Sequence, residues 1–381
     1  MLNLADKPIS GETVLATYLI KGTSEEVRRI ANLICHEHTV ELPPSLVTEG
    51  FMADHVIADV IRIAEGKTTC EVDIAYAIEL AQGGLSTLLT LVMGNAGFFP
   101  QVTLKGLTFS TSPKTLGLKG PKFGVNGIRE LVGVNKGPIC ATALKPLGAS
   151  SEELASIAYE MAAGGIEIIK EDDSMSTQFF APLEDRVRKC ADAIQDANAK
   201  YGTKTLYAPN LSGAIDSLSE RAHKVKELGA NAVMVIPGVV GYDAIRWLRD
   251  DDGLGLPIIS HSAWLGGMCR EPFPALSLSV AFGDLNRLAG SDMAIMPGTH
   301  GRFGLSENEC RNTTTQLTCL SDLKPVLPSP GGGITPDTIK DVIPIFGESC
   351  APLISGALFM GSDGLRASCQ RFREEINRLR D

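Results

Sequence analysis

The chain has 381 residues, and its 45 acidic residues outnumber its 35 lysines and arginines, which gives a net charge of −10. This charge argues against nucleic acid or an anionic membrane as the main partner, while the length exceeds that of a usual single domain and predicts two. The nine cysteines include no CxxC pair, and no segment resembles a secretion signal or a membrane span, so we expect a cytoplasmic protein without a disulfide framework or zinc.

Residues 1–135 mix strand-like and helix-like segments and predict a small α+β domain. The expected strands are Thr13–Lys21 and Val72–Leu80, and the expected helices are Ser24–Leu33 and Leu85–Met93. The glycine-, proline- and lysine-rich stretch Lys114–Gly124 predicts a loop that leads toward the next domain.

Residues 136–381 alternate short apolar, β-rich runs with longer amphipathic segments, a pattern typical of parallel strands joined by helices. Eight such runs predict a closed (β/α)8 barrel, the TIM-barrel fold. The expected strands are Ile139–Leu144, Ile166–Lys170, Thr205–Asn210, Ala232–Ile236, Pro257–His261, Met293–Pro297, Pro325–Pro330 and Pro352–Gly356. The expected helices include Ser151–Ala163, Leu183–Tyr201, Ala214–Leu228 and Asp337–Phe346.

Polar residues stand where these strands end, and in such barrels the chemistry gathers at the carboxyl ends of the strands. Lys170 and Asp172 should project to one side of an extended segment, with Asp173 at the turn beyond. A partly desolvated lysine loses its proton more easily and can react with CO2 to form an anionic carbamate. That anion and two acids would provide the oxygen ligands that Mg²⁺ prefers. The alternative is a simple ion-pair cluster at the end of a buried strand.

A glycine run, Gly331-Gly332-Gly333, follows the seventh strand and lets backbone N–H groups approach a phosphate closely. Ser355 and Gly356 follow the eighth strand, and barrels commonly bind phosphate between these two strand ends. An ordinary surface loop is the alternative.

His261 ends the fifth strand. It is placed to shuttle a proton or to hold a hydroxyl group of a substrate; the alternative is a histidine satisfied by core partners.

Three motifs, in the same order along the chain, resemble those of ribulose-bisphosphate carboxylase (RuBisCO) large subunits, and more closely those of the RuBisCO-like proteins that do not fix CO2. Leu144–Gly148 looks like the family's first-strand lysine motif, Gly164–Gln178 like its metal-site motif, and Leu85–Phe98 like the segment with an active-site asparagine. The later histidine, triple-glycine and serine–glycine stretches are similar as well. The resemblance covers nearly the whole chain and implies a ferredoxin-like first domain.

The resemblance also implies roles for matching residues of the barrel. Lys170 becomes a carbamylated ligand of Mg²⁺, together with Asp172 and with Asp173, where the family usually has glutamate. Lys145 becomes the lysine beside the substrate carbonyl. The catalytic base is then expected to be Lys145 or the carbamate of Lys170.

Two residues of the first domain match the family too. Asn95 and Glu37 look like the contribution of a neighbouring subunit to the active site. The resemblance therefore implies a homodimer, or an assembly of dimers, whose active sites are shared between subunits.

The chain departs from carboxylases in the residues that follow the fifth and sixth strands. Carboxylation needs a lysine on the loop after strand six, to reach the developing carboxylate, and Met296–Gly304 contains none. Ser262 replaces the family's phosphate-binding arginine, and Met296 stands in place of a histidine. Ser262 remains a candidate substrate contact, and Arg302 is a substitute phosphate ligand.

The sequence thus predicts Mg²⁺-dependent enolisation of a phosphorylated ketose or keto-sugar acid, by an isomerase or a decarboxylase and not by CO2 fixation. Two alternatives stay open. One is an enolase-type tautomerase of a thiosugar phosphate, and the other is a non-catalytic regulatory binding protein.

Overall fold

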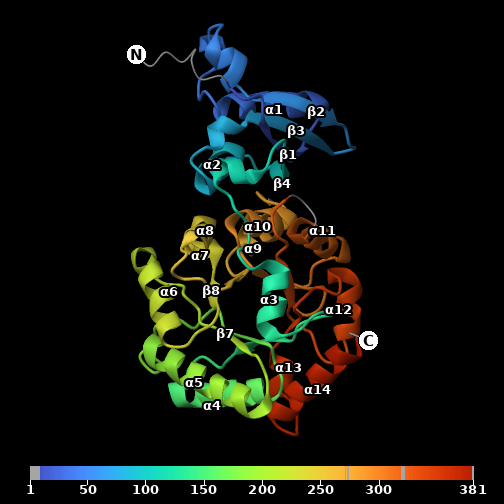
Figure 1. Ribbon diagram of the computed structural model, residues 1–381. Coiled ribbons are helices and arrows are strands. Elements are labelled where there is room, and N and C mark those ends of the chain that lie inside the picture. Colours follow the sequence, from blue (N-terminus) through green and yellow to red (C-terminus); the bar gives the residue numbers. More distant parts are fainter. Residues whose placement is uncertain (1–8, 271, 273, 319–321, 380–381) are drawn as a thin grey trace.

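The computed structural model describes residues 9–270, 272, 274–318 and 322–379. Figure 1 shows two parts, a small sheet with its helices and a larger ring of helices around a barrel. The predicted class, a TIM barrel preceded by a smaller α+β domain, is confirmed.

The N-terminal sheet is antiparallel, with the strand order β2-β3-β1-β4. Its strands are β1 (Thr13–Lys21), β2 (Asp59–Ala64), β3 (Thr69–Ala77) and β4 (Val102–Phe109), and its helices are α1 (Ser24–Glu37) and α2 (Leu85–Met93). Alternate residues of β1 are buried, as expected for a sheet with one face on a core. Among them is Tyr18, whose hydroxyl donates to the Val92 carbonyl of α2 at 2.5 Å.

Several expectations for this domain are corrected. Strands β2 and β4 were not predicted, because β2 is a bulged edge strand with no buried residue and Lys105-Gly106 interrupts the apolar pattern of β4. The expected strand Val72–Leu80 overlaps β3. The observed strand ends earlier than expected, at Ala77, since Ile78–Ala81 forms a 3-10 turn.

Eight parallel strands form the barrel in the order β7-β6-β5-β12-β11-β10-β9-β8. A bridge between Asn210 and Met234 links the β7 and β8 ends and closes the ring. The strands are β5 (Ala141–Leu144), β6 (Ile168–Glu171), β7 (Leu206–Ala208), β8 (Val233–Val235), β9 (Ile258–Ser260), β10 (Met293–Pro297), β11 (Leu327–Gly331) and β12 (Leu353–Ile354). Each overlaps one predicted run, so the prediction of eight strands is confirmed.

Helices surround this ring (Figure 1). They are α4 (Ser151–Ala163), α5 (Leu183–Tyr201), α6 (Leu218–Glu227), α7 (Pro237–Val240), α8 (Tyr242–Asp250), α9 (Gly266–Cys269), α10 (Leu285–Ala289), α11 (Glu307–Thr318), α12 (Ile339–Phe346), α13 (Gly356–Phe359) and α14 (Leu365–Arg378). The expected helix Ala214–Leu228 is split into a 3-10 turn and α6, and the expected helix Asp337–Phe346 begins two residues later, at Ile339. Among the described residues, none of the helices combines the length and the apolar character needed to cross a bilayer.

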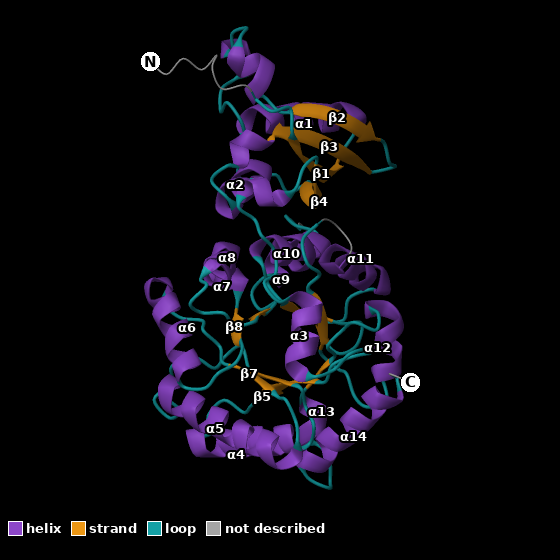
Figure 2. Cartoon of the chain, in the orientation of Figure 1, coloured by secondary structure: helices purple, strands orange, loops and turns teal. Residues whose placement is uncertain are grey.

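Helix α3 (Gly124–Val132) closes the amino-terminal end of the barrel, and Figure 2 shows it lying across the ring of strands. Its buried residues Val125, Ile128 and Val132 belong to the same apolar cluster as the first residues of several strands. Residues that cover the barrel thus begin before residue 136, and the division of the chain at residues 135 and 136 stays a prediction.

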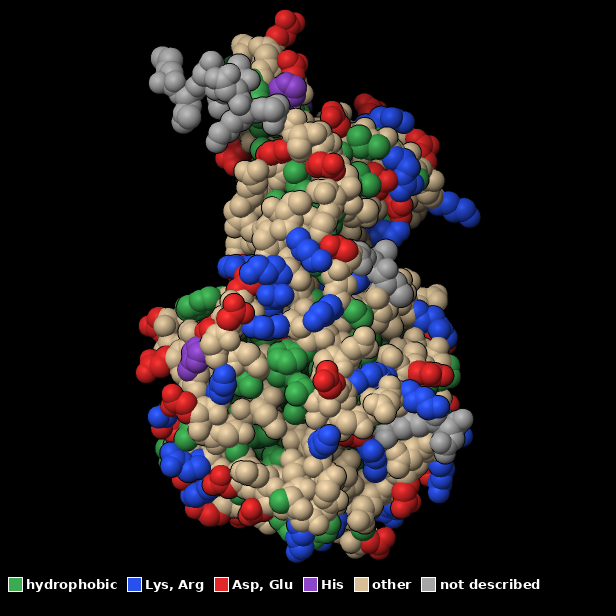
Figure 3. Space-filling model, viewed as in Figure 1, with side chains coloured by type: hydrophobic (Ala, Val, Ile, Leu, Met, Phe, Trp, Pro, Cys, Tyr) green, Lys and Arg blue, Asp and Glu red, His purple; other side chains and the backbone are tan. Residues whose placement is uncertain are grey.

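The two parts of the molecule are joined by backbone hydrogen bonds at β4. Leu104 donates to the Ala275 carbonyl and accepts from the Ser277 N–H, both at 2.9 Å. Lysine and arginine side chains gather at this neck in Figure 3, while both signs of charge are interspersed over the barrel face shown there. This interspersed pattern is typical of a water-exposed surface.

Candidate active site

Lys170 lies on β6, inside the barrel, with only 1% of its side chain exposed. Its Nζ donates to Asp172 Oδ1 at 3.2 Å, so the predicted common orientation of these two side chains is observed. Burial lowers the pKa of Lys170, and the nearby charge of Asp172 opposes this only in part. The amine is therefore easier to deprotonate than an ordinary lysine, which favours reaction with CO2.

Asp172 stands between two lysines. Its Oδ2 lies 3.0 Å from Lys145 Nζ, while Oδ1 accepts from Lys170. Burial alone would raise the pKa of this carboxyl, but the two ammonium groups outweigh burial and lower it to about 2. Asp172 is consequently ionised throughout the neutral range and is held by partners that ligand binding can replace.

His261 follows β9 and faces the same cluster. Its Nδ1 accepts a hydrogen bond from the Ala263 N–H at 3.1 Å, which leaves the proton of a neutral ring on Nε2. Burial, together with the positive charges of Lys170 and Lys145, lowers the pKa of His261 to about 3. The ring is neutral at pH 7 and can donate from Nε2.

The fit of this cluster to Mg²⁺ depends on the oxygen donors that it offers. Asp173 is exposed beside Asp172, and within the described ranges no three His, Cys, Asp or Glu side chains come together as a ready metal site. Two carboxylates alone provide few of the oxygen ligands that the ion takes. Because Lys170 is buried next to them, its carbamate would add the missing anionic oxygens, and the residues fit Mg²⁺ on that condition.

Glu171 lies between these residues in the sequence, but its side chain points away from them and is fully buried. Arg186 of α5 binds both of its oxygens, at 2.7 and 3.1 Å, and the Tyr207 hydroxyl donates to it at 2.7 Å. This pair was not predicted from the sequence, where its only signal is the alternation that turns Glu171 away from Lys170.

The triple-glycine loop follows β11 and packs against the loop after β10. Gly332 and Gly333 have φ values of +90° and +71°, and a Cβ on Gly333 would lie 2.4 Å from the Gly301 nitrogen. Only glycine permits this backbone contact. Across the β11–β12 edge, Gly356 begins α13, and the buried Ser355 Oγ has no hydrogen-bond partner among the described residues. An unpartnered buried hydroxyl beside this loop is a feature of a ligand site.

The residues that depart from carboxylases lie after β9 and in or after β10. Ser262 is half-buried, and Met296 is buried inside β10. Arg302 is exposed and stacks over the Phe303 ring at 4.9 Å. Arg302 thus lies on the exposed surface of its loop, and within the described residues no hydrogen bond joins it to the glycine run.

Glu37 and Asn95 meet in the N-terminal domain. The Asn95 amide donates to Glu37 Oε1 at 2.6 Å, and the Ala96 N–H donates to His38 Nε2 at 3.0 Å. In the described part of the chain, no hydrogen bond or ion pair joins Glu37 or Asn95 to Lys145, Lys170 or His261. The structure brings the pair together, but not with the barrel residues.

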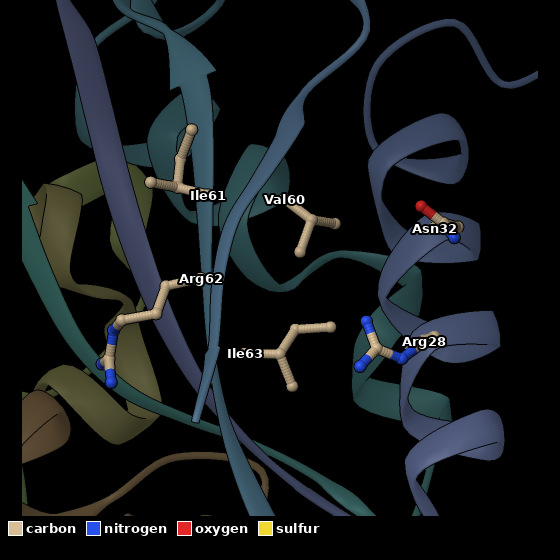
Figure 4. Close-up of a pocket in the computed structure, with 6 residues that line it drawn as sticks. All are labelled: Arg28, Asn32, Val60, Ile61, Arg62 and Ile63. Carbon is tan, nitrogen blue, oxygen red and sulfur yellow. The ribbon is translucent and has the colours of Figure 1, made fainter. Parts of the chain in front are cut away.

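A separate open groove of about 380 Å³ lies between α1 and β2 (Figure 4). It is lined by Arg28, Asn32, Val60, Ile61, Arg62 and Ile63. None of these residues is one of the predicted site residues, and the groove has no acid or histidine to perform chemistry, so the barrel mouth remains the candidate site.

Comparison with known proteins identifies the family. The family model described as ribulose bisphosphate carboxylase large chain, catalytic domain, matches residues 124–367, well over half of the chain. The chain belongs to the RuBisCO large-chain family. The resemblance inferred from the motifs is thereby confirmed.

Three curated relatives of this RuBisCO-family chain are similar over most of its length. Ribulose bisphosphate carboxylase-like protein 1 of Rhodopseudomonas palustris is 32% identical over 96% of this chain and 98% of the relative. The 5-methylthioribulose-1-phosphate isomerase of Rhodospirillum rubrum is 30% identical over 94% of each chain. The 2,3-diketo-5-methylthiopentyl-1-phosphate enolase of Bacillus licheniformis is 29% identical over 96% of this chain and 91% of the relative.

Solved structures of the family superpose on the whole molecule. A Rubisco-like protein from Rhodopseudomonas palustris matches with a TM-score of 0.86 and 28% identity over 97% of this chain and 98% of that one. The octameric RuBisCO of Pyrococcus horikoshii matches with a TM-score of 0.86 and 28% identity over 96% and 89%. Relatives with isomerase and enolase names make this chain a member of an enzyme superfamily.

Proposed function

We propose that the protein enolises a phosphorylated ketose or keto-sugar acid at the mouth of its barrel, as an isomerase or a decarboxylase. The observation that carries this proposal is the buried amine of Lys170, 3.2 Å from Asp172, with Lys145 bound to the same carboxylate. Burying Lys170 and bringing the half-buried Lys145 to the same acid is costly for a fold, and a barrel does not need this cluster for stability. A site for a charged ligand explains the cluster better than a structural ion pair.

Lys170 as its carbamate, Asp172 and Asp173 would hold Mg²⁺. When bound, the ion supplies Lewis acidity that stabilises negative charge on a carbonyl oxygen. Forming the carbamate converts one of the two ammonium partners of Asp172 into an anion, and so it also releases Oδ1 from its present hydrogen bond.

The remaining residues orient the substrate and move its proton. The base that removes the proton next to the carbonyl is Lys145 or a carbamate oxygen of Lys170. Neutral His261 donates from Nε2 to a substrate hydroxyl or returns a proton. The backbone N–H groups of Gly331–Gly333 and Gly356, with the Ser355 hydroxyl, bind the phosphate.

CO2 fixation does not fit the same mouth. The loop Met296–Gly304 has no lysine to stabilise a new carboxylate. Ser262 and Met296 also lack the cationic groups that a second phosphate requires, which favours a monophosphate. Arg302 is the available cation on this side and is free of ion pairs within the described ranges, so it serves as a contact for the far end of the substrate.

Enolase-type tautomerisation of a thiosugar phosphate is the second candidate, because relatives of similar identity bear that name and the related isomerase name. All of these reactions begin with the loss of a group next to a carbonyl, so the same set of residues serves each of them. A regulatory protein that binds a sugar phosphate without reaction is the non-catalytic alternative.

The working unit is a homodimer, or an assembly of dimers, in the cytoplasm. Its support is the separation of Glu37 and Asn95 from the barrel cluster in one chain. Near that pair Phe98 is 86% exposed, and on the loops at the barrel mouth Phe179 and Trp264 are 94% and 69% exposed. Apolar side chains on both surfaces favour contact between the N-terminal domain of one copy and the barrel mouth of another.

The test is an NMR screen of phosphorylated ketoses and keto acids in D2O with Mg²⁺ and bicarbonate, with Lys170→Ala as the control. Deuterium that enters next to the carbonyl in the wild type and not in the variant supports enolisation, and release of CO2 identifies a decarboxylase. Binding without either reaction contradicts the proposal and favours the regulatory alternative.

A further inference from the structure

The loop after β6 carries both acids of the site, and one buried side chain from the next strand holds it. Asn210, which follows β7, is 1% exposed. Its amide nitrogen donates to the carbonyls of Asp172 at 3.3 Å, Asp173 at 3.0 Å and Met175 at 2.7 Å. One amide group therefore contacts the backbone at both predicted metal ligands.

Asn210 is itself fixed by its other polar groups. Its Oδ1 accepts from the Ser212 N–H at 2.9 Å, and its backbone N–H donates to Glu171 Oε2 at 3.0 Å. The amide orientation is thus determined, since the oxygen faces a donor and the nitrogen faces acceptors.

A buried arginine completes this arrangement at the far end of the loop. Arg186 binds Glu171 with two nitrogens and also donates to the carbonyls of Ser176 at 2.8 Å and Ala181 at 2.5 Å. Both ends of the loop are consequently tied to buried side chains that are not among the predicted metal ligands. Fixed outer partners of this kind orient metal ligands and preserve their affinity.

We propose that Asn210 is a positioning residue, which sets the affinity of the site for CO2 and Mg²⁺ by holding the backbone of Asp172 and Asp173. It touches no substrate and supplies no ligand. The inference rests on the proposed function in one respect, because it takes Lys170 as the residue that binds CO2. Asn210 is not one of the predicted metal ligands, and a measurement of stability alone does not reveal whether it positions them.

Two variants remove the donor in different ways. Asn210→Asp keeps the shape and the acceptor for Ser212 but places an oxygen against three carbonyls, and Asn210→Ala removes the group without adding charge. Asn198→Ala is the matched control. Asn198 also holds a turn next to β7, by accepting from Thr205 N at 3.0 Å and from Thr203, but it does so at the opposite end of that strand.

The experiment measures three quantities on each full-length protein with bicarbonate. These are the Mg²⁺ affinity by calorimetry, the lysine carbamate signal from ¹³C-labelled bicarbonate by NMR, and the amide hydrogen exchange of residues 172–178. Both Asn210 variants should bind Mg²⁺ about 10- to 100-fold more weakly, lose carbamate signal and exchange faster in this loop. Asn198→Ala should match the wild type in all three, even if it is less stable.

Wild-type affinity and carbamate signal in both Asn210 variants would overturn the inference and leave the proposed function standing. A wild type without any carbamate would contradict the proposed function instead. Hydrogen exchange then decides the positioning role by itself, since equal protection of the loop in the wild type and the Asn210 variants overturns it and faster exchange in the variants upholds it. If Asn210→Ala does not fold, the isosteric Asn210→Asp carries the same comparison.

Discussion

Each end of the barrel contains a carboxylate next to a strand terminus, and the two carboxylates differ in their burial and in their hydrogen-bond partners. At the amino-terminal end, Asp292 is fully buried and accepts from the backbone N–H groups of Phe123, Gly124 and Ile258 at 2.7, 2.8 and 2.9 Å. At the carboxyl end, Asp172 is partly exposed and contacts two lysine side chains.

The chemistry of the partners separates structure from function. Burial raises the pKa of Asp292, opposed by three backbone donors that no ligand can displace, so this acid fixes α3 on the barrel. At Asp172 the two lysines outweigh burial and lower the pKa to about 2. Lysine side chains can move, and one of them can become a carbamate. The Asp172 carboxylate can therefore exchange its lysine partners for a bound ligand.

The largest effect should come from Lys170→Met. Methionine fills the buried space but cannot form a carbamate, so we expect enolisation to fall by about 10² to 10⁴-fold, with no loss of stability because a buried amine is removed. The rate of enolisation is measured by deuterium exchange next to the carbonyl, in D2O with Mg²⁺ and bicarbonate. Lys189→Met, which removes a surface lysine paired with Asp185 and Glu152, is the control and should keep wild-type activity.

Asp292→Ala should show the reverse pattern. The change leaves three buried N–H groups without acceptors, and we expect the free energy of unfolding to fall by about 3 kcal/mol or more, measured by urea denaturation. Activity per folded molecule should remain. An unchanged free energy of unfolding, or a folded variant that fails to bind Mg²⁺, would contradict the assignment of a structural role to Asp292 and a ligand-binding role to Asp172.

Gly333→Ala should weaken phosphate binding. Its Cβ would lie 2.4 Å from the Gly301 nitrogen, so the loops after β10 and β11 must separate. We expect KM to rise about tenfold, or about 1.4 kcal/mol. Gly347→Ala is a matched control, because Gly347 also has a positive φ, +79°, but has open space around its Cβ position. An equal rise in KM for both variants would attribute the effect to general strain.

The smallest effect concerns His261 and acid stability. Its folded pKa of about 3 lies below the ordinary value of 6.5, so the unfolded chain binds more protons between these values and stability falls as pH decreases from 6.5 to 3. His261→Gln should make this decline shallower, as measured by the denaturation midpoint at pH 7 and pH 4.5. Asp172 does not interfere, because its own loss of stability occurs between about pH 3.8 and 2. An unchanged decline would show that His261 takes up its proton equally in both states.

The barrel and part of its mouth could be predicted from the sequence because their signals are local. Buried parallel strands form apolar runs such as Met293–Pro297, and the alternation along β6 turns Lys170 and Asp172 to one side. Strand β2 was not predicted, because a bulge at the sheet edge removes the alternation of buried and exposed side chains on which such a prediction depends.

The supporting contacts could not be predicted, since they join residues that only the fold brings together. Asn210 stands 37 residues after Asp173 along the chain, and nothing in its neighbourhood indicates that its amide would contact that carbonyl. The same holds for the backbone contact between Gly301 and Gly333, and for the bidentate pairing of Arg186 with Glu171.

The most direct test of the central claim is a crystal structure of the protein grown with Mg²⁺ and bicarbonate. We predict a carbamate on Lys170 Nζ and an ion bound by it together with Asp172 and Asp173. An unmodified amine that still donates to Asp172, with no ion at the mouth, would contradict the account.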